Sequence, residues 1–249
     1  QMENPVTALA WGVFIAGVAQ LLFQIPFLMK AHSLPLPKLS GAKAGVDRIL
    51  KLMLPALFGS SIVQINLLIN TIIASYLLAG SISWLYISDR FVELPLALFG
   101  IATATVILPI LSKQHVSNQH HAFDQTLQWA LKVSLLISIP AMLGLLVLSG
   151  PILFTLVQYR EFSLFDTQMA TLSLMASSLG LPAFIFIKIL APGFYSRQDT
   201  KTPVKIGVFV ILINIVLNLL FIGFLPDLKT PGAHAGLALV TSFSAYVNA

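Results

Sequence analysis

Residues 204–225 read VKIGVFVILINIVLNLLFIGFL, an apolar run interrupted by one lysine and two asparagines. An α-helix needs about 20 residues of this kind to cross the hydrocarbon core of a bilayer. Strands of a membrane barrel would instead alternate apolar and polar residues over about 10 positions, and this run does not alternate. We therefore predict a transmembrane helix here.

Further runs of the same character precede this one. They are Val6–Leu28, Leu52–Leu78, Trp84–Leu111, Leu127–Leu148 and Thr167–Leu190. Another, Ala235–Ala249, is too short for a span, and because the chain stops inside it we expect a fragment of a longer protein. The runs predict an all-α, polytopic transmembrane helical bundle with about six complete spans plus a truncated one.

The composition agrees with lipid as the solvent. Apolar residues make up 57% of the chain, charged residues 9%, and the mean hydropathy is +0.90. A soluble domain carries roughly a quarter charged residues, so a soluble catalytic domain is excluded. The net charge of +5 comes from basic residues in short loops between the apolar runs. In a membrane protein this pattern indicates how the spans are oriented, so we predict no nucleic-acid partner.

Lysine and arginine set the predicted orientation. The predicted loops 29–51, 112–126 and 195–205 hold nine basic residues, whereas the loops between them hold only Arg160 and Lys229. Loops rich in lysine and arginine stay in the cytoplasm. We therefore place these three loops on the cytoplasmic side.

Residues 83–95, SWLYISDRFVELP, put ionisable groups into the third run. Arg90 and Glu93 share a helix face, Ser83 lies on the same stripe, and Asp89 flanks Glu93. One interpretation is an intrahelical ion pair that lowers the cost of insertion. The other is a cavity-facing arginine, held by Glu93 or Asp89, whose planar fork of donors suits phosphate. The residues alone leave both open.

Asparagines form a second polar group inside the runs. Asn66 and Asn70 are four residues apart, as are Asn214 and Asn218, and Thr241 lies in the last run. Such side chains commonly form hydrogen bonds between membrane helices. A cation site would use the same oxygens but usually adds a carboxylate, and none is present among them.

No catalytic constellation is visible. HExxH, GxSxG and Walker A sequences are absent. The histidines fall in predicted loops or at interfaces, namely His32, His115, His120, His121 and His234. We predict no enzymatic activity, no metal and no cofactor.

Residues 191–205, APGFYSRQDTKTPVK, resemble the signature loop of the MurJ (MviN) lipid II flippases. This family belongs to the superfamily of multidrug, oligosaccharidyl-lipid and polysaccharide exporters. Residues 17–26 (GVAQLLFQIP), 83–95 and 108–113 (LPILSK) resemble the family as well. The resemblance therefore covers essentially the whole chain in order.

The resemblance implies a fourteen-helix fold in which two six-helix lobes form a V around a central cavity. Residues 1–31 would be the last helix of the first lobe, and residues 32–51 a cytoplasmic basic loop. Residues 52–249 would be the second lobe, with spans seven to eleven and the start of span twelve. The rest of the first lobe and a two-helix groove for the lipid tail would lie outside this chain.

The resemblance also implies a function. The family carries the undecaprenyl-pyrophosphate-linked peptidoglycan precursor from the inner to the outer leaflet of the bacterial cytoplasmic (inner) membrane, by alternating access. Arg90 matches a cavity arginine of the second lobe, and Ser83 and Glu93 match polar positions beside it. With Asp89, these residues would form the wall that binds the lipid diphosphate.

A cation site is implied for some relatives on the spans that hold Asn70, Asn214, Asn218 and Thr241. Those relatives have carboxylates where this sequence has asparagine.

The resemblance also implies partners, namely the precursor, membrane lipids and cell-wall synthesis proteins, and a role in cell wall biogenesis and cell shape. The alternatives are an exporter of another lipid-linked polysaccharide or of drugs, a membrane scaffold for cell-wall enzymes, and an intramembrane enzyme.

Overall fold

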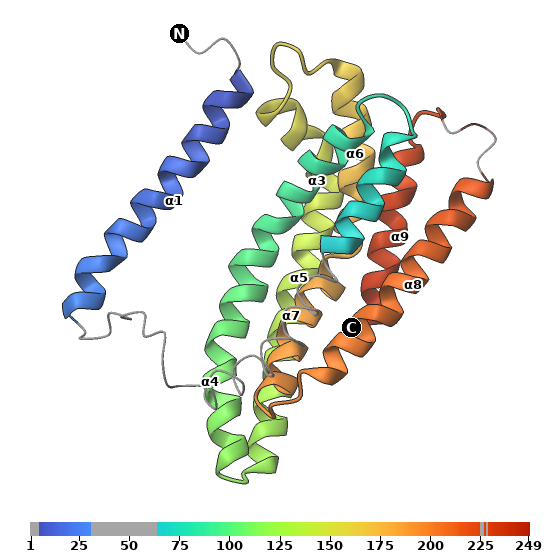
Figure 1. The fold of residues 1–249 in the computed structure, drawn as a ribbon. Helices are drawn as coiled ribbons and strands as arrows, with labels where there is room; N and C mark the ends of the chain where they lie inside the picture. The colour runs from blue at the N-terminus through green and yellow to red at the C-terminus, as the bar shows by residue number, and fades with distance from the viewer. Residues whose placement is uncertain (1–4, 31–63, 225–226, 228) are drawn as a thin grey trace. The chain divides into compact units, whose positions relative to one another are not determined.

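The computed structural model describes residues 5–30, 64–224, 227 and 229–249, and the secondary structure in these residues is helical (Figure 1). The chain divides into two compact units, Gln1–Ile49 and Leu50–Ala249. The predicted all-α class is confirmed for the described residues.

The first unit contributes helix α1, Pro5–Lys30. It confirms the predicted helix over Val6–Leu28. Large apolar side chains such as Val13, Phe14 and Phe23 are exposed along it. Its apolar surface therefore fits a helix that is solvated by lipid.

The described part of the second unit opens with a short apolar helix, Gln64–Ser75, and continues with longer ones. The further elements are α3 (Ser81–Pro95), the π-helix η1 (Leu96–Ile101), α4 (Ala102–Val116), α5 (His120–Leu156), α6 (Leu164–Ser178), α7 (Leu181–Tyr195), α8 (Lys201–Phe224) and α9 (Ala233–Asn248). Since α3, η1 and α4 form one unbroken helix over Ser81–Val116, the third predicted run is a single span.

The number of spans agrees with the prediction as far as the described residues allow. Within them, four helices are long and apolar enough to cross a membrane, or five if α6 and α7 count as one span. The first part of the run Leu52–Leu78 lies outside the described residues. The last run forms α9, which at 16 residues is too short for a complete span, as expected.

The run Thr167–Leu190 is bent by 45° between α6 and α7, which its hydropathy did not predict. Gly180 and Pro182 stand at the break. Proline lacks the N–H that would continue the helical ladder. A Cβ at Gly180 would lie 2.9 Å from the Cα of Ser242, so glycine also lets α9 approach the bend.

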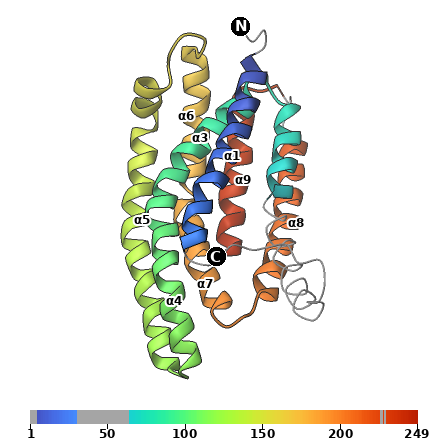
Figure 2. The same ribbon diagram turned by 60° about the vertical axis from the view of Figure 1, so that its left-hand side comes forward.

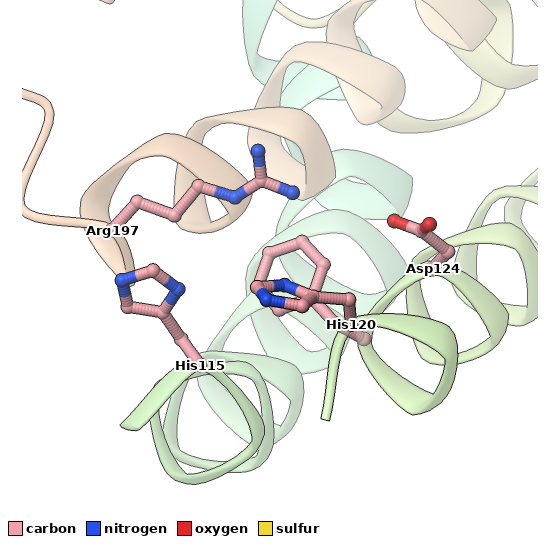
Figure 3. Close-up of a pocket in the computed structure, with 5 residues that line it drawn as sticks. His115, His120, Asp124 and Arg197 are labelled. Atoms are coloured by element: carbon pink, nitrogen blue, oxygen red, sulfur yellow. The ribbon is translucent and has the colours of Figure 1, made fainter. Parts of the chain in front are cut away.

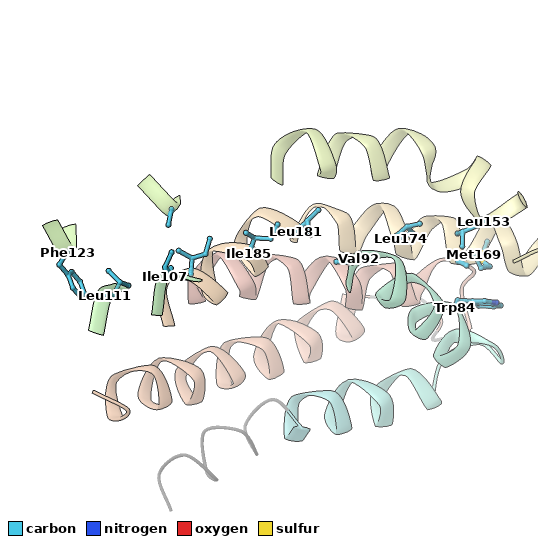
Figure 4. Packing of buried hydrophobic residues seen from close by; sticks show 13 residues of the cluster. Trp84, Val92, Ile107, Leu111, Phe123, Leu153, Met169, Leu174, Leu181 and Ile185 are labelled. Atoms are coloured by element: carbon cyan, nitrogen blue, oxygen red, sulfur yellow. The ribbon is translucent and has the colours of Figure 1, made fainter. Parts of the chain in front are cut away.

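The core of the second unit forms around α6 and α7. Figure 4 shows the buried side chains Leu174, Leu181 and Ile185 along these helices, with Trp84 and Val92 of α3 beside them. Helix α6 contacts α3, α5 and α9. Its buried face also carries the small residues Ala170, Ser173, Ala176, Ser177 and Ser178. Small residues let membrane helices approach closely.

One end of the second unit brings two of the predicted basic loops together. The turn between α4 and α5 and the connection between α7 and α8 lie at the same end of the bundle (Figures 1 and 2). There, the Arg197 guanidinium carbon lies 4.4 Å from the Phe123 ring centroid. The segments 112–126 and 195–205, which are largely helical and not loops throughout, therefore share one side, as expected. Its assignment to the cytoplasm stays a prediction.

The opposite end is held by a polar contact between α3, α6 and α9. Trp84 Nε1 donates to Asp166 Oδ1 at 2.9 Å, and Asp166 forms a capping box with Ser163. The His234 ring centroid lies 4.7 Å from that of Trp84, with the two rings tilted by 52°, and its Nε2 donates to the Met169 carbonyl at 3.0 Å. His234 lies in the first turn of α9, at the end of the bundle where an interfacial residue is expected, and it is buried there with only 1% of its surface exposed.

The bend at Gly180 yields a stability prediction. We expect Gly180→Ala to lower the free energy of unfolding by about 1–3 kcal/mol, because the new Cβ forces the neighbouring helices apart. Its Cβ would lie 2.7 Å from Ser242 Oγ, whereas nothing lies within 4 Å of a Cβ at Gly144. Gly144→Ala is therefore the matched control and should be neutral or stabilising by up to about 1 kcal/mol. Thermal unfolding in detergent measures both, and a Gly180→Ala protein as stable as the wild type would contradict the prediction.

Candidate functional site

Arg90 on α3 is held by two side chains of its own helix. Its Nη1 donates to Glu93 Oε2 at 2.8 Å, and its Nη2 donates to the Tyr86 hydroxyl at 2.8 Å. The guanidinium carbon also lies 4.7 Å from the centroid of the Tyr86 ring. Since these residues lie four before and three after Arg90, they share its helix face. We call these three residues the arginine clamp.

The arginine clamp leaves much of the guanidinium free. Arginine has five N–H donors in a fixed plane, and the two bonds above use two of them. The side chains of Arg90 and Glu93 are 59% and 58% exposed in the second unit. An ionisable group on a membrane-spanning helix usually faces a cavity or another part of the protein. The remaining donors are therefore available to an anionic ligand.

The other predicted members of this wall lie on the same helix without joining the clamp. Asp89 and Ser83 are both exposed. Among the described residues, the ion pair of Arg90 is with Glu93, and neither Asp89 nor Ser83 hydrogen bonds to Arg90. Of the two acidic residues that the sequence offered as partners, the structure selects Glu93.

Tyr86 is the member of the clamp that sequence analysis missed. It precedes Arg90 by four residues, the spacing at which helical side chains meet. The signal was therefore present in the sequence, but tyrosine is also common at membrane interfaces. Only the geometry shows that the ring and the hydroxyl both contact the guanidinium.

The predicted polar group, apart from Asn66, forms a hydrogen-bonded network between three helices, whereas Asn66 Oδ1 is buried without a partner. Asn218 Nδ2 of α8 donates to Asn70 Oδ1 of the helix Gln64–Ser75 at 3.0 Å, and to Asn214 Oδ1 at 3.0 Å. Asn70 Nδ2 donates to Thr241 Oγ1 of α9 at 3.4 Å, and Asn214 Nδ2 donates to Ser244 Oγ at 3.2 Å. Asn214 and Asn218 are fully buried. The structure thus brings together all four residues of the candidate cation site.

The chemistry of this network is that of neutral amides. The Oδ1 atoms of Asn70 and Asn214 accept from Asn218, while Asn218 Oδ1 is buried without a partner. Among the described residues, no carboxylate hydrogen bonds to this network. The same residues contain no group of three or more histidine, cysteine or acidic side chains that could hold a metal ion. The bonds shown are those by which polar residues join membrane helices.

Comparison with known proteins gives consistent matches over the whole chain. The family model described as "Lipid II flippase MurJ" matches residues 1–249. The "Probable lipid II flippase MurJ" of Vibrio cholerae is 51% identical over 247 residues, which is 99% of this chain and 46% of that protein. The protein of the same name from Haemophilus influenzae is 48% identical over 255 residues, which is 100% of this chain and 48% of that protein.

A solved structure agrees. "Lipid II flippase MurJ, inward closed conformation" superposes with a TM-score of 0.71 at 30% identity and covers 89% of this chain and 46% of that one. The "Lipid II flippase MurJ" of Burkholderia cenocepacia is 41% identical over 251 residues, or 99% of this chain and 47% of that protein. The chain therefore spans about half the length of the curated relatives it matches.

Proposed function

The chain belongs to the MurJ family of lipid II flippases, and from this membership we propose that it is part of a protein that moves the lipid-linked peptidoglycan precursor across a bacterial cytoplasmic membrane. The substrate would be the undecaprenyl-pyrophosphate-linked precursor, and the direction from the inner to the outer leaflet. Residues 1–31 would be the last helix of the first lobe, 32–51 the cytoplasmic basic loop, and 52–249 most of the second lobe.

The observation that carries this proposal is the arginine clamp. A diphosphate offers oxygens that match the planar guanidinium fork. Arg90 keeps donors free on an exposed face of α3, while Glu93 and Tyr86 fix the plane of the guanidinium. In the proposed mechanism these donors hold the diphosphate in the cavity between the two lobes, together with cationic residues of the first lobe. The lipid tail remains in the bilayer.

Glu93 would also limit how tightly the substrate is held. Its carboxylate lies 2.8 Å from Arg90 Nη1 and so competes with the phosphate for the same cation. A transporter has to release what it binds on the other side, and rocking of two lobes around the bound headgroup provides that exit. No covalent step is required, so we propose a transporter without enzymatic activity. A charge that moves through the membrane field gains about 2.3 kcal/mol per 100 mV, which would bias one of the steps.

Replacing Arg90 tests the proposal. In the full-length protein, we expect Arg90→Ala to abolish precursor flipping, because the diphosphate loses its charge-assisted bonds, about 1.5–3 kcal/mol each. Arg90→Lys should also fail or be severely impaired, because lysine lacks the planar fork. The measurement is growth and precursor flipping in cells depleted of their own flippase. Arg160→Ala, in the loop between α5 and α6, is the control. If both Arg90 variants transport normally at wild-type membrane levels, the phosphate role of Arg90 is wrong.

Tyr86 permits a finer test. We expect Tyr86→Phe to lower the transport rate about 3- to 10-fold, since one hydrogen bond to the guanidinium is lost and the ring remains. Tyr86→Leu removes both contacts and should lower the rate further. Tyr76→Phe is a matched control, because Tyr76 is 69% exposed and lies in the turn before α3. A Tyr86→Leu protein with the wild-type rate would remove Tyr86 from the mechanism.

The asparagine network permits a test of cation coupling. We expect the melting temperature of the full-length wild-type protein to be the same in NaCl and in choline chloride, because neutral amides bind a cation poorly without a carboxylate. Asn214→Asp supplies a carboxylate between Asn218 and Ser244 and should create a sodium-dependent rise. A sodium-dependent rise in the wild type would instead establish Asn70, Asn214, Asn218 and Thr241 as a working cation site.

A further inference from the structure

A pocket of about 160 Å³ opens at the end of the second unit where the α4–α5 turn meets the α7–α8 connection. It is lined by His115, His120, Phe123, Asp124 and Arg197. At about 30 Å³ per water molecule, it has room for a small polar group of several heavy atoms. The arginine clamp and the asparagine network share no residue with it.

Arg197 is held over this pocket by packing. Its guanidinium carbon lies 4.4 Å from the centroid of the Phe123 ring, and Phe123 is only 3% exposed. The backbone turns sharply just after it, since Gln198 has a φ of 59°. A cation stacked on an aromatic face keeps its N–H edges free for other partners. The side chain is therefore ordered without using its hydrogen-bonding capacity.

Arg197 has no acidic partner among the described residues. Its nearest acidic neighbour in sequence, Asp199, is committed to the start of α8. Asp199 accepts from the hydroxyl of Thr202 at 2.6 Å and from the amides of Thr202 and Lys201 at 3.0 and 3.1 Å. The hydroxyl bond, more than the others, holds the pKa of Asp199 below its usual range. Asp199 therefore stays ionised as a helix cap and leaves Arg197 unneutralised.

Asp124 supplies the opposite charge across the pocket. Figure 3 shows the guanidinium of Arg197 and the carboxylate of Asp124 extending toward one another, with His115 and His120 along the same space. The described ion pairs do not include one between Arg197 and Asp124. The pocket thus presents a positive and a negative group separated by a gap, and imidazole N–H donors beside it.

An exposed aromatic side chain stands between the pocket and the spans. Tyr195, the last residue of α7 and two residues before Arg197, is 48% exposed, and tyrosine is enriched at membrane interfaces. Lys113 and Lys201 stand at the same end of the bundle. A charged recess beside an exposed interfacial tyrosine suits a ligand with a polar head and an apolar tail better than a free ion.

We propose that this pocket binds the headgroup of a zwitterionic phospholipid of the phosphatidylethanolamine class. The phosphate diester accepts from Arg197 and from the imidazoles, and the ammonium group donates to Asp124. The acyl chains run from the pocket past Tyr195 toward the spans. Asp124 decides the headgroup, because an anionic lipid such as phosphatidylglycerol has no cation to place against the carboxylate. This site is separate from the proposed precursor site and does not depend on it.

Native mass spectrometry of the full-length protein tests this proposal. The probes are phosphatidylethanolamine and phosphatidylglycerol with identical acyl chains. The wild type should prefer phosphatidylethanolamine. Arg197→Gln should weaken the first binding event of both lipids about tenfold through loss of the charge-assisted bonds. Asp124→Asn should remove the preference for phosphatidylethanolamine while leaving phosphatidylglycerol binding unchanged or stronger.

Controls separate binding from folding and from a free anion. Arg160→Gln makes the same chemical change in the loop between α5 and α6 and should leave both affinities unchanged. Arg197→Lys keeps the charge and should restore part of the affinity, and melting temperatures identify any variant that is merely unfolded. If Asp124→Asn keeps the wild-type preference, or if inorganic phosphate displaces the lipid at equal concentration, the proposal is overturned.

Discussion

Polar side chains within the spans have to find their partners inside the protein, because the hydrocarbon core of the membrane offers none. Two kinds of side-chain contact answer this demand for most of these groups. Arg90 takes partners from its own helix, so that its charge is balanced by Glu93 whatever lies opposite. The asparagines take partners from other helices, so that Asn218 ties α8 to the helix Gln64–Ser75. The first kind of contact leaves a surface available for a ligand, and the second joins the bundle.

Backbone carbonyls serve as further partners where helices approach closely. Ser88 of α3 donates to the Ala170 carbonyl of α6 at 2.9 Å, and Ser242 of α9 donates to the Ala176 carbonyl at 2.8 Å. Both carbonyls belong to α6, whose buried face carries small residues. A serine hydroxyl needs little space and can bond to a neighbouring backbone, which compensates for the weak hydrophobic drive between helices in lipid. Helix α6 is therefore the element around which α3 and α9 are arranged.

Hydropathy predicted where the spans lie, because a run of apolar residues long enough to cross the bilayer has few alternatives to a helix. It did not predict the bend before Leu181, because a hydropathy average does not register Gly180 and Pro182 as a break, and the close approach of Gly180 to Ser242 of α9 is visible only in the tertiary structure. The π-helix Leu96–Ile101 was missed for a related reason, since one additional residue in a helical turn leaves hydropathy unchanged. The spacing of Arg90 and Glu93 revealed their contact, whereas the contact between Asn70 and Asn218 required the tertiary structure.

The contact of Trp84 with Asp166 and His234 gives the molecule an optical property. Among the three tryptophans of the chain, Trp84 is 1% exposed, whereas Trp11 and Trp129 are 52% and 58% exposed. Its indole contacts an imidazole and donates to a carboxylate, so its fluorescence depends on the contact between α3, α6 and α9. If these helices separate, the surroundings of Trp84 change directly and those of Trp129 do not. Helix separation at this end of the bundle can therefore be followed by intrinsic fluorescence, without an added label.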